Sequence, residues 1–329
     1  MPCYKTLALV SAADEFTPLH TAVYVAASDT IVGTMGNFLA EFNSTTGAFI
    51  RAVNVSSPMY GPMNICLLGS DPYLACHNDR SVQNVGGTVH VHVRDDIFSV
   101  NTSTLQLGSG LGIPTLHIDA DYESEGGPRQ FVQIGNKVYF LFPIDNKVLI
   151  VYVDKTAPGV WGGSHPANNA FWTEQIATDG TSVYTCDPYL EQIDYHTATL
   201  GAGGHSHVTG YHPTSCIWVP APVGKIHAVC ADKYLIRVDV FATSTNSYFD
   251  LETLISSVVT GIKPMRLRYN SVDGLIYIPV QNKDGIIVYD PVAETAVWKS
   301  GFDSPVDAVF TPSKKFAVQS SLEGLKEIT

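Results

Sequence analysis

Short apolar runs alternate with turn-forming residues along the chain, and the clearest example lies between Pro264 and Pro305. Four runs of β-branched and aromatic residues follow one another there, at 265–269, 275–280, 286–290 and 295–302, separated by clusters of Asn, Asp, Gly and Pro. This pattern predicts a four-stranded antiparallel meander. Because so small a sheet cannot bury both of its faces alone, we expect copies of it to pack alongside.

Prolines mark the start of each expected copy. A proline precedes a short apolar run in seven similar segments, at Pro18, Pro62, Pro128, Pro166, Pro213, Pro264 and Pro305. Proline suits the first residue of a strand because it fixes φ and has no N–H to donate to the ladder. The turn before the fourth strand also recurs, starting at Asn43, Asn101, Asp154, Tyr195 and Asp290, and its Asn, Asp, Ser and Thr side chains are expected to cap it. These repeats predict a closed ring of seven blades that start near residues 18, 62, 128, 166, 213, 264 and 305.

The two ends of the chain are expected to meet in the last blade. Only three strands fit between Pro305 and the end of the sequence, while residues 4–10 have the length and pattern of a fourth. A blade completed in this way (three strands plus one) leaves no free sheet edges in the ring. The apolar stretch at 7–13, after Lys5, is at the lower limit of length for an export signal, so we expect no signal peptide.

The chain resembles the seven-bladed β-propellers, and within them the YVTN-repeat and lactonase-like branch. The resemblance rests on the proline register, on blade length and on phrases such as IIVYDPVAETAVW at 286–298, and it spans residues 1–329. It implies one all-β domain with the first strand of each blade along a central channel. In lactonase-like propellers a divalent cation sits in that channel on carboxylate and Asn side chains.

Composition narrows the choice of partners. Charged residues make up only 15% of the chain, and 19 basic against 31 acidic residues give a net charge of -12. No cluster of Lys and Arg is present, which disfavours nucleic acid and anionic membranes as partners. No apolar run is long enough for a membrane span. The acidic, Ser- and Thr-rich chain is therefore expected to meet other proteins.

The central channel is the first candidate site. Counting two residues past each proline gives seven polar side chains: His20, Asn64, Gln130, Asn168, Ser215, Arg266 and Asp307. Two positions further on, the residues are mostly apolar, with Arg268 as an exception. One interpretation is a solvated, inert channel mouth above a packed wall. The other, which follows from the resemblance, is a Ca²⁺ or Mg²⁺ site on Asp307, His20, Asn64 and Asn168, although a single carboxylate is few for such ions.

Three other groups of residues could bind metal. His90 and His92 are two residues apart in an expected strand and so share a face, and His205 and His207 repeat that spacing, with His212 nearby. Paired imidazoles can contribute to a zinc site, which needs three or four ligands, but surface histidines are the alternative. An acidic insertion places Asp119, Asp121, Glu123 and Glu125 at alternate positions. That segment is either a Ca²⁺ loop or a solvated loop without the EF-hand pattern.

The cysteines also allow two interpretations. Cys66 and Cys76, and Cys216 and Cys230, lie on adjacent expected strands, so disulfides are conceivable. Cys76, Cys186 and Cys230, however, occupy one repeat position that other copies fill with apolar residues. We therefore expect buried free thiols and synthesis in a reducing compartment.

Three functional hypotheses follow. The first is a non-enzymatic propeller that serves as a structural or protein-interaction module. The composition of the chain would suit a subunit of a large assembly such as a virus or phage particle. Its contacts would lie on a propeller face or on the insertions at 78–95 and 108–127, and it would need no cofactor. The second is a divalent-metal-dependent, lactonase- or lyase-like enzyme with its site in the channel. The third is carbohydrate binding through aromatic residues such as Trp161, Trp172 and Tyr211.

Overall fold

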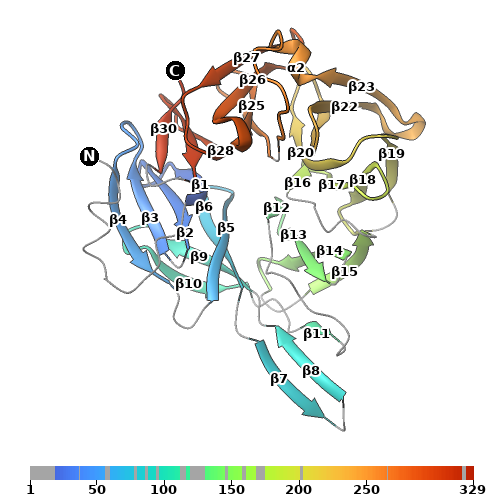
Figure 1. Cartoon of the computed structure of the whole chain (residues 1–329). Coiled ribbons are helices and arrows are strands. Elements are labelled where there is room, and N and C mark those ends of the chain that lie inside the picture. Colours follow the sequence, from blue (N-terminus) through green and yellow to red (C-terminus); the bar gives the residue numbers. More distant parts are fainter. Residues whose placement is uncertain are drawn as a thin grey trace.

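Antiparallel sheets of short strands fan around a common axis in the computed structural model of the chain (Figure 1). The structure describes residues 19–36, 38–55, 60–77, 80–85, 88–93, 96–111, 116–118, 130–144, 147–157, 161–167, 175–200, 203–264, 266–320 and 324–329. Within these residues, seven sheets form the blades of a ring and an eighth sheet lies outside it. This arrangement confirms the predicted all-β ring of seven blades.

The first three blades contain four strands each. Blade 1 is formed by β1 (Leu19–Val25), β2 (Thr30–Met35), β3 (Phe38–Asn43) and β4 (Phe49–Asn54). Blade 2 is formed by β5 (Tyr60–Leu68), β6 (Asp71–His77), β9 (Asp96–Asn101) and β10 (Gln106–Gly110). Blade 3 is formed by β12 (Phe131–Ile134), β13 (Lys137–Ile144), β14 (Lys147–Asp154) and β15 (Trp161–Ala167).

The remaining blades follow in sequence order. Blade 4 is β16 (Ile176–Thr178), β17 (Ser182–Asp187), β18 (Gln192–Thr197) and β19 (Gly204–His207). Blade 5 is β20 (Pro213–Val219), β21 (Lys225–Cys230), β22 (Tyr234–Val240) and β23 (Thr245–Asp250), with η1 (Phe241–Thr243) before β23 and α2 (Leu251–Leu254) after it. Blade 6 is β24 (Arg268–Asn270), β25 (Leu275–Val280), β26 (Gly285–Asp290) and β27 (Thr295–Ser300), with η2 (Gln281–Lys283) before β26. Blade 7 is β28 (Pro305–Phe310), β29 (Lys315–Gln319) and β30 (Leu325–Glu327).

The two insertions meet in one additional sheet. The first contributes β7 (Arg80–Val85) and β8 (Thr88–Val93), and the second contributes β11 (Leu116–Ile118). These strands pair in the order β11-β8-β7, apart from the sheets of the ring. Figure 1 shows this insertion sheet projecting from the ring near blades 2 and 3.

The hydrophobic core lies between blades rather than within them. Seven clusters of buried residues occur among the described residues, and each joins two neighbouring blades around the ring. The second strands are buried along almost their whole length because a neighbouring blade covers each face, as in β2, β17 and β25. One cluster packs Leu19 and Phe42 of blade 1 against Phe316 of blade 7 and so closes the ring. Non-directional burial of apolar surface is the main favourable term in holding such a ring together.

Side-chain caps fix the recurring turn before the fourth strand. The Asn43 Oδ1 atom accepts hydrogen bonds from the Thr45 and Thr46 amides at 3.0 and 2.9 Å. Asn101, Asp154 and Asp290 accept equivalent bonds from residues two or three positions on. Four of the five recurring turns are therefore capped by the side chain at their first position, as expected.

One predicted blade boundary is wrong. Pro166 lies inside β15, where it pairs with Leu149, so it belongs to the fourth strand of blade 3. The first strand of blade 4 is β16, which begins at Ile176. Proline is tolerated in β15 because this strand has a ladder partner on one side only among the described strands. The expected closing strand at residues 4–10 lies outside the described residues.

The cysteines that the structure describes are buried thiols. Cys66, Cys186, Cys216 and Cys230 are all buried, and none of the four takes part in a disulfide. Cys66 pairs across the strands with Tyr73 rather than with a cysteine, because the register places a proline opposite Cys76. The predicted free thiols are confirmed at these four positions, while Cys3 and the side chain of Cys76 lie outside the described residues.

Candidate functional site

A recurring bulge sets the direction of the side chains along the central axis. In blades 1, 2, 5 and 7 the register of the first two strands shifts directly after Leu19, Pro62, Pro213 and Pro305 respectively. A bulge inserts one extra residue and re-aims the side chains that follow it. The next paired residues are Thr21, Asn64, Ser215 and Asp307.

This register corrects one of the sequence-predicted positions. Leu19 occupies in blade 1 the place that proline fills in the other three blades, so Thr21 rather than His20 is equivalent to Asn64 and Asp307. Thr21 is fully buried, and its hydroxyl donates to the Ile65 carbonyl of blade 2 at 3.3 Å. His20 is the bulged residue and is exposed.

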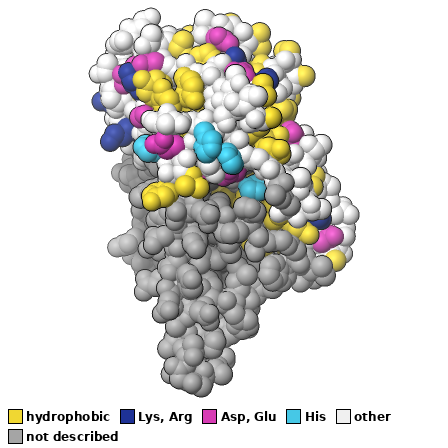
Figure 2. All heavy atoms as spheres, turned by 90° about the vertical axis from the view of Figure 1, so that its right-hand side faces the viewer, with side chains coloured by type: hydrophobic (Ala, Val, Ile, Leu, Met, Phe, Trp, Pro, Cys, Tyr) yellow, Lys and Arg dark blue, Asp and Glu magenta, His cyan; other side chains and the backbone are white. Residues whose placement is uncertain are grey.

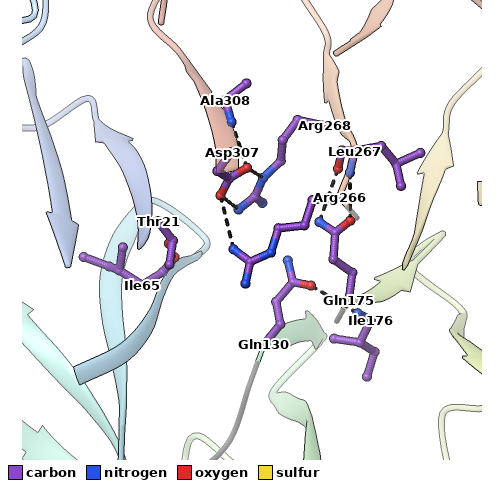
Figure 3. A network of polar contacts seen from close by, with 10 residues as sticks. All are labelled: Thr21, Ile65, Gln130, Gln175, Ile176, Arg266, Leu267, Arg268, Asp307 and Ala308. Carbon is purple, nitrogen blue, oxygen red and sulfur yellow. Dashed lines mark hydrogen bonds and ion pairs between the residues drawn. The ribbon is translucent and has the colours of Figure 1, made fainter. Parts of the chain in front are cut away.

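Glutamines occupy the corresponding places in blades 3 and 4. Gln130 precedes β12, and its Oε1 atom accepts a hydrogen bond from the Ile176 amide at 3.1 Å. Gln175 precedes β16 and takes the place expected for Asn168, which lies outside the described residues. Gln175 donates to the Leu267 carbonyl at 3.2 Å and accepts from the Leu267 amide at 3.1 Å, which joins blade 4 to blade 6 past blade 5 (Figure 3).

The polar residues near the axis are therefore buried, and Thr21, Gln130 and Gln175 are hydrogen-bonded to protein. Exposed fractions are 0% for Thr21 and Ser215, 7% for Asn64, 9% for Gln130 and 2% for Gln175. We expected these side chains to form an open, solvated ring, but they are buried. Buried polar groups require partners, and the glutamines find theirs on neighbouring first strands.

Asp307 is the centre of a charged network (Figure 3). Its Oδ1 atom accepts from Arg268 Nε at 2.7 Å and from the Ala308 amide at 2.8 Å, and its Oδ2 atom accepts from Arg268 Nη2 at 2.6 Å. A second guanidinium approaches, with Arg266 Nη1 at 3.9 Å from Oδ2. The carboxylate is 0% exposed. Two guanidinium groups thus face one carboxylate that is already held in a bidentate pair.

Charge and burial oppose each other at this network. Burial acts to lower the pKa of Arg268, but attraction and hydrogen bonding to Asp307 outweigh it and raise the pKa above its ordinary value. Burial raises the pKa of the neighbouring Cys66 thiol, with the two arginines acting in the opposite direction. Arg268 therefore stays charged and Cys66 stays protonated at neutral pH.

Comparisons with known proteins bear on the fold. No protein-family model matches the chain, and no curated protein matches it in sequence. Among solved structures, a streptogramin B lyase superposes with a TM-score of 0.66 at 10% identity, covering 96% of this chain and 94% of the lyase chain. YCF48 bound to a D1 peptide superposes with a TM-score of 0.59 at 10% identity, covering 97% of both chains. The chain is a seven-bladed β-propeller. At this identity, the likeness extends to the fold alone.

A basic pocket opens in the propeller beside the Asp307 network. The cavity has a volume of about 170 Å³ and lies where blades 6, 7 and 1 meet. His20, Lys263, Arg266, Pro279, Gln281, Pro305 and Val306 line it. The pKa of His20 is lowered because the surrounding protein desolvates the imidazole and the Arg266 charge repels its protonated form. We call this cavity the basic pocket.

The other histidine candidates of the propeller do not form one cluster. The rings of His205 and His207 in β19 lie 4.4 Å apart, edge to face, and histidines gather on this outer side of the molecule (Figure 2). His212 is engaged elsewhere, with its Nδ1 atom 2.8 Å from the Pro188 carbonyl. No group of three or more His, Cys, Asp or Glu residues able to hold a metal occurs among the described residues.

The insertion sheet adds a histidine that the sequence pattern did not single out. The register pairs His117 of β11 with His92 of β8, and His90 precedes His92 by two residues in the same strand. These three positions therefore share one face of the insertion sheet. The zinc hypothesis for His90 and His92 stays a prediction. Asp119, Asp121, Glu123 and Glu125 lie outside the described residues.

Aromatic residues proposed for carbohydrate binding are in part committed to packing. The Tyr211 ring stacks on Tyr248 at a centroid distance of 4.7 Å and meets Tyr234 edge-on at 4.8 Å. Trp172 and the side chain of Trp161 lie outside the described residues. Within the part of the chain that the structure describes, no helix has the length and apolar character needed to cross a membrane.

Proposed function

We propose that this propeller is a non-enzymatic module that docks other proteins. The observation that supports this function best is the state of Asp307, the carboxylate that the lactonase-like alternative needs. Both of its oxygens accept from the Arg268 guanidinium, and one also accepts from a backbone amide. A Ca²⁺ or Mg²⁺ ion would have to displace this bidentate pair and sit beside two guanidinium groups.

The insertion sheet is the surface that we propose for docking. It projects from the ring (Figure 1), and β7 pairs only with β8 among the described strands. An unpaired strand edge presents backbone donors and acceptors that another chain can extend. The solved propeller YCF48 is bound to a peptide, which supports protein binding as a use for this architecture. Membership of a large assembly such as a virus or phage particle is the finer form of the proposal, supported by the low charge of the chain.

A deletion variant tests whether docking uses the insertion sheet rather than the ring. Cys76 of β6 pairs with Asp96 of β9 at the base of the insertion, so residues 78–95 can be replaced by Asn-Gly, which with His77 makes a three-residue hairpin loop and keeps the blade 2 register. We expect the shortened chain to keep the urea midpoint of the full chain but to lose cross-links to partner proteins, measured by cross-linking mass spectrometry in the native extract. Undiminished cross-links would contradict docking through the insertion sheet.

A metal census tests the enzymatic alternative. Under that alternative Asp307, His20, Asn64 and Asn168 would hold a divalent cation, and the purified protein would contain it stoichiometrically. We expect elemental analysis to find no stoichiometric Ca²⁺ or Mg²⁺, and EDTA to leave the melting temperature unchanged. A bound cation whose removal lowers the melting temperature, and whose binding is lost in Asp307→Asn, would replace the present proposal with the channel enzyme. Adding Zn²⁺ to the same series tests the histidines of the insertion sheet.

A further inference from the structure

The basic pocket is lined by basic side chains although the protein as a whole is acidic. Lys263, Arg266 and His20 line it, and none of the described residues that line it is acidic. The nearest carboxylate in the network, Asp307, is shared between Arg266 and the bidentate partner Arg268. Arg266 and Arg268 both approach Asp307, and Lys263 adds a third cation beside them, in a chain whose net charge is -12.

The pocket is held open by fixed elements. The loop that carries Lys263 is held at its backbone, since the Lys263 amide donates to Asn282 Oδ1 at 3.1 Å and Asn282 Nδ2 donates to the Gly261 carbonyl at 2.8 Å. Glu252 accepts from the Ile262 amide at 3.2 Å on the other side of the loop. Arg266 follows directly in the approach to β24, with its side chain 17% exposed. A site built in this way loses little conformational entropy when a ligand binds.

Bulge geometry supplies the opposite wall. His20 and Val306 are the extra residues of the bulges in β1 and β28, and both line the pocket, while the residues that follow them, Thr21 and Asp307, are buried. The same backbone irregularity therefore separates the buried network from the open pocket. The volume of about 170 Å³ is large enough to hold several water molecules or a small ligand.

We propose that the basic pocket binds a small oxyanion, a carboxylate or phosphate group, between Lys263 and Arg266. The Arg266 guanidinium fork matches two oxygens of either group, and the Lys263 ammonium, from the same connecting segment, adds a charge-assisted donor. Gln281 and His20 provide further polar atoms on the lining. Binding of such an anion does not depend on docking through the insertion sheet, since the two surfaces lie on different blades.

Titration calorimetry with inorganic phosphate and with succinate, at constant ionic strength, tests this proposal. We expect one saturable site per chain for at least one of the two anions. Lys263→Gln and Arg266→Gln should each weaken binding by about ten- to a hundredfold, the range for a hydrogen bond to a charged group. Lys326→Gln, the same change at an exposed residue of β30, should leave it unchanged.

His20 gives a second, independent readout. An anion in the pocket opposes the Arg266 repulsion, so saturating phosphate or succinate should raise the His20 pKa measured by NMR, with His20→Gln identifying the signal. A peptide with a free terminal carboxylate, compared with its amide, tests whether the anion can come from a protein. The proposal is overturned if neither anion saturates a site, or if both lining variants bind as tightly as the wild type. Urea midpoints of the variants check that each retains the fold.

Discussion

Breaking the Asp307–Arg268 pair should destabilise the propeller more than its surface ion pairs do. Asp307 is 0% exposed and Arg268 is 24% exposed, with two short hydrogen bonds between them. Asp307→Asn keeps the size of the side chain and an oxygen for the Ala308 amide but leaves Arg268 without its counter-charge. Arg268→Met leaves the carboxylate buried, with Arg266 at 3.9 Å as its remaining cation.

The magnitude follows from the cost of stranding a buried charge. Removing one partner of a buried pair typically costs about 3–5 kcal/mol. We expect Asp307→Asn to lower the free energy of unfolding by about 3 kcal/mol, because the guanidinium left without its partner is still partly exposed to water. Arg268→Met should lower it by at least as much. The double variant Arg268→Met/Asp307→Leu should cost clearly less than the sum of the two single changes, because it removes both charges of the bidentate pair together.

Urea unfolding followed by both fluorescence and circular dichroism measures these free energies, and agreement of the two probes checks that the ring unfolds in one step. The exposed pair between Lys314 and Glu327, at 2.6 Å with 33% and 39% of the side chains exposed, is the matched control. Lys314→Met should cost less than about 1 kcal/mol. The reasoning is refuted if Asp307→Asn costs no more than this control, or if the double variant costs the full sum.

Two further predictions concern buried polar groups. Desolvation lowers the pKa of His227 from its ordinary 6.5 to about 4, with Arg237 acting in the same direction and Asp239 in the opposite one. Between these pH values His227 is protonated in the unfolded chain but not in the folded chain. The free energy of unfolding should therefore fall by about 3 kcal/mol as the pH drops from about 6.5 to 4. Urea titrations at several pH values measure this fall, and His227→Phe should remove it. Gln175→Ala leaves the Leu267 amide and carbonyl without their partner, so we expect a loss of about 2 kcal/mol and faster exchange of the Leu267 amide by NMR. A Gln175→Ala chain with wild-type stability and exchange would contradict this role.

The sequence predicted the blades well where strands were local and apolar. In blade 6 the four runs between Pro264 and Pro305 became β24 to β27, because each strand pairs with the next across a short turn. The proline rule failed at Pro166 because proline fits the outer fourth strand as well as the first. A proline therefore marks the edge of a sheet ladder and not one particular strand of the blade.

The candidate site was only partly predictable. Asn64, Ser215 and Asp307 follow their prolines at the expected distance, but the bulge moved the equivalent position in blade 1 from His20 to Thr21. Gln175 could have been found by counting back from the second strand of blade 4, since its register with β16 is regular. The pairing of Arg268 with Asp307 had no sequence signal, because the two residues lie in different blades.

By itself, the sequence determined the local elements, their repetition and therefore the ring, because alternating apolar runs and turn residues act over a few neighbouring positions. It also determined that cysteines at the repeated core position would be buried thiols. Only the tertiary structure decided which polar side chains meet at the axis, since those contacts join blades far apart in the chain. It paired the buried carboxylate of Asp307 with Arg268 and placed Lys263 and Arg266 on the lining of a pocket. Long-range electrostatics and bulge geometry, rather than composition, set that outcome.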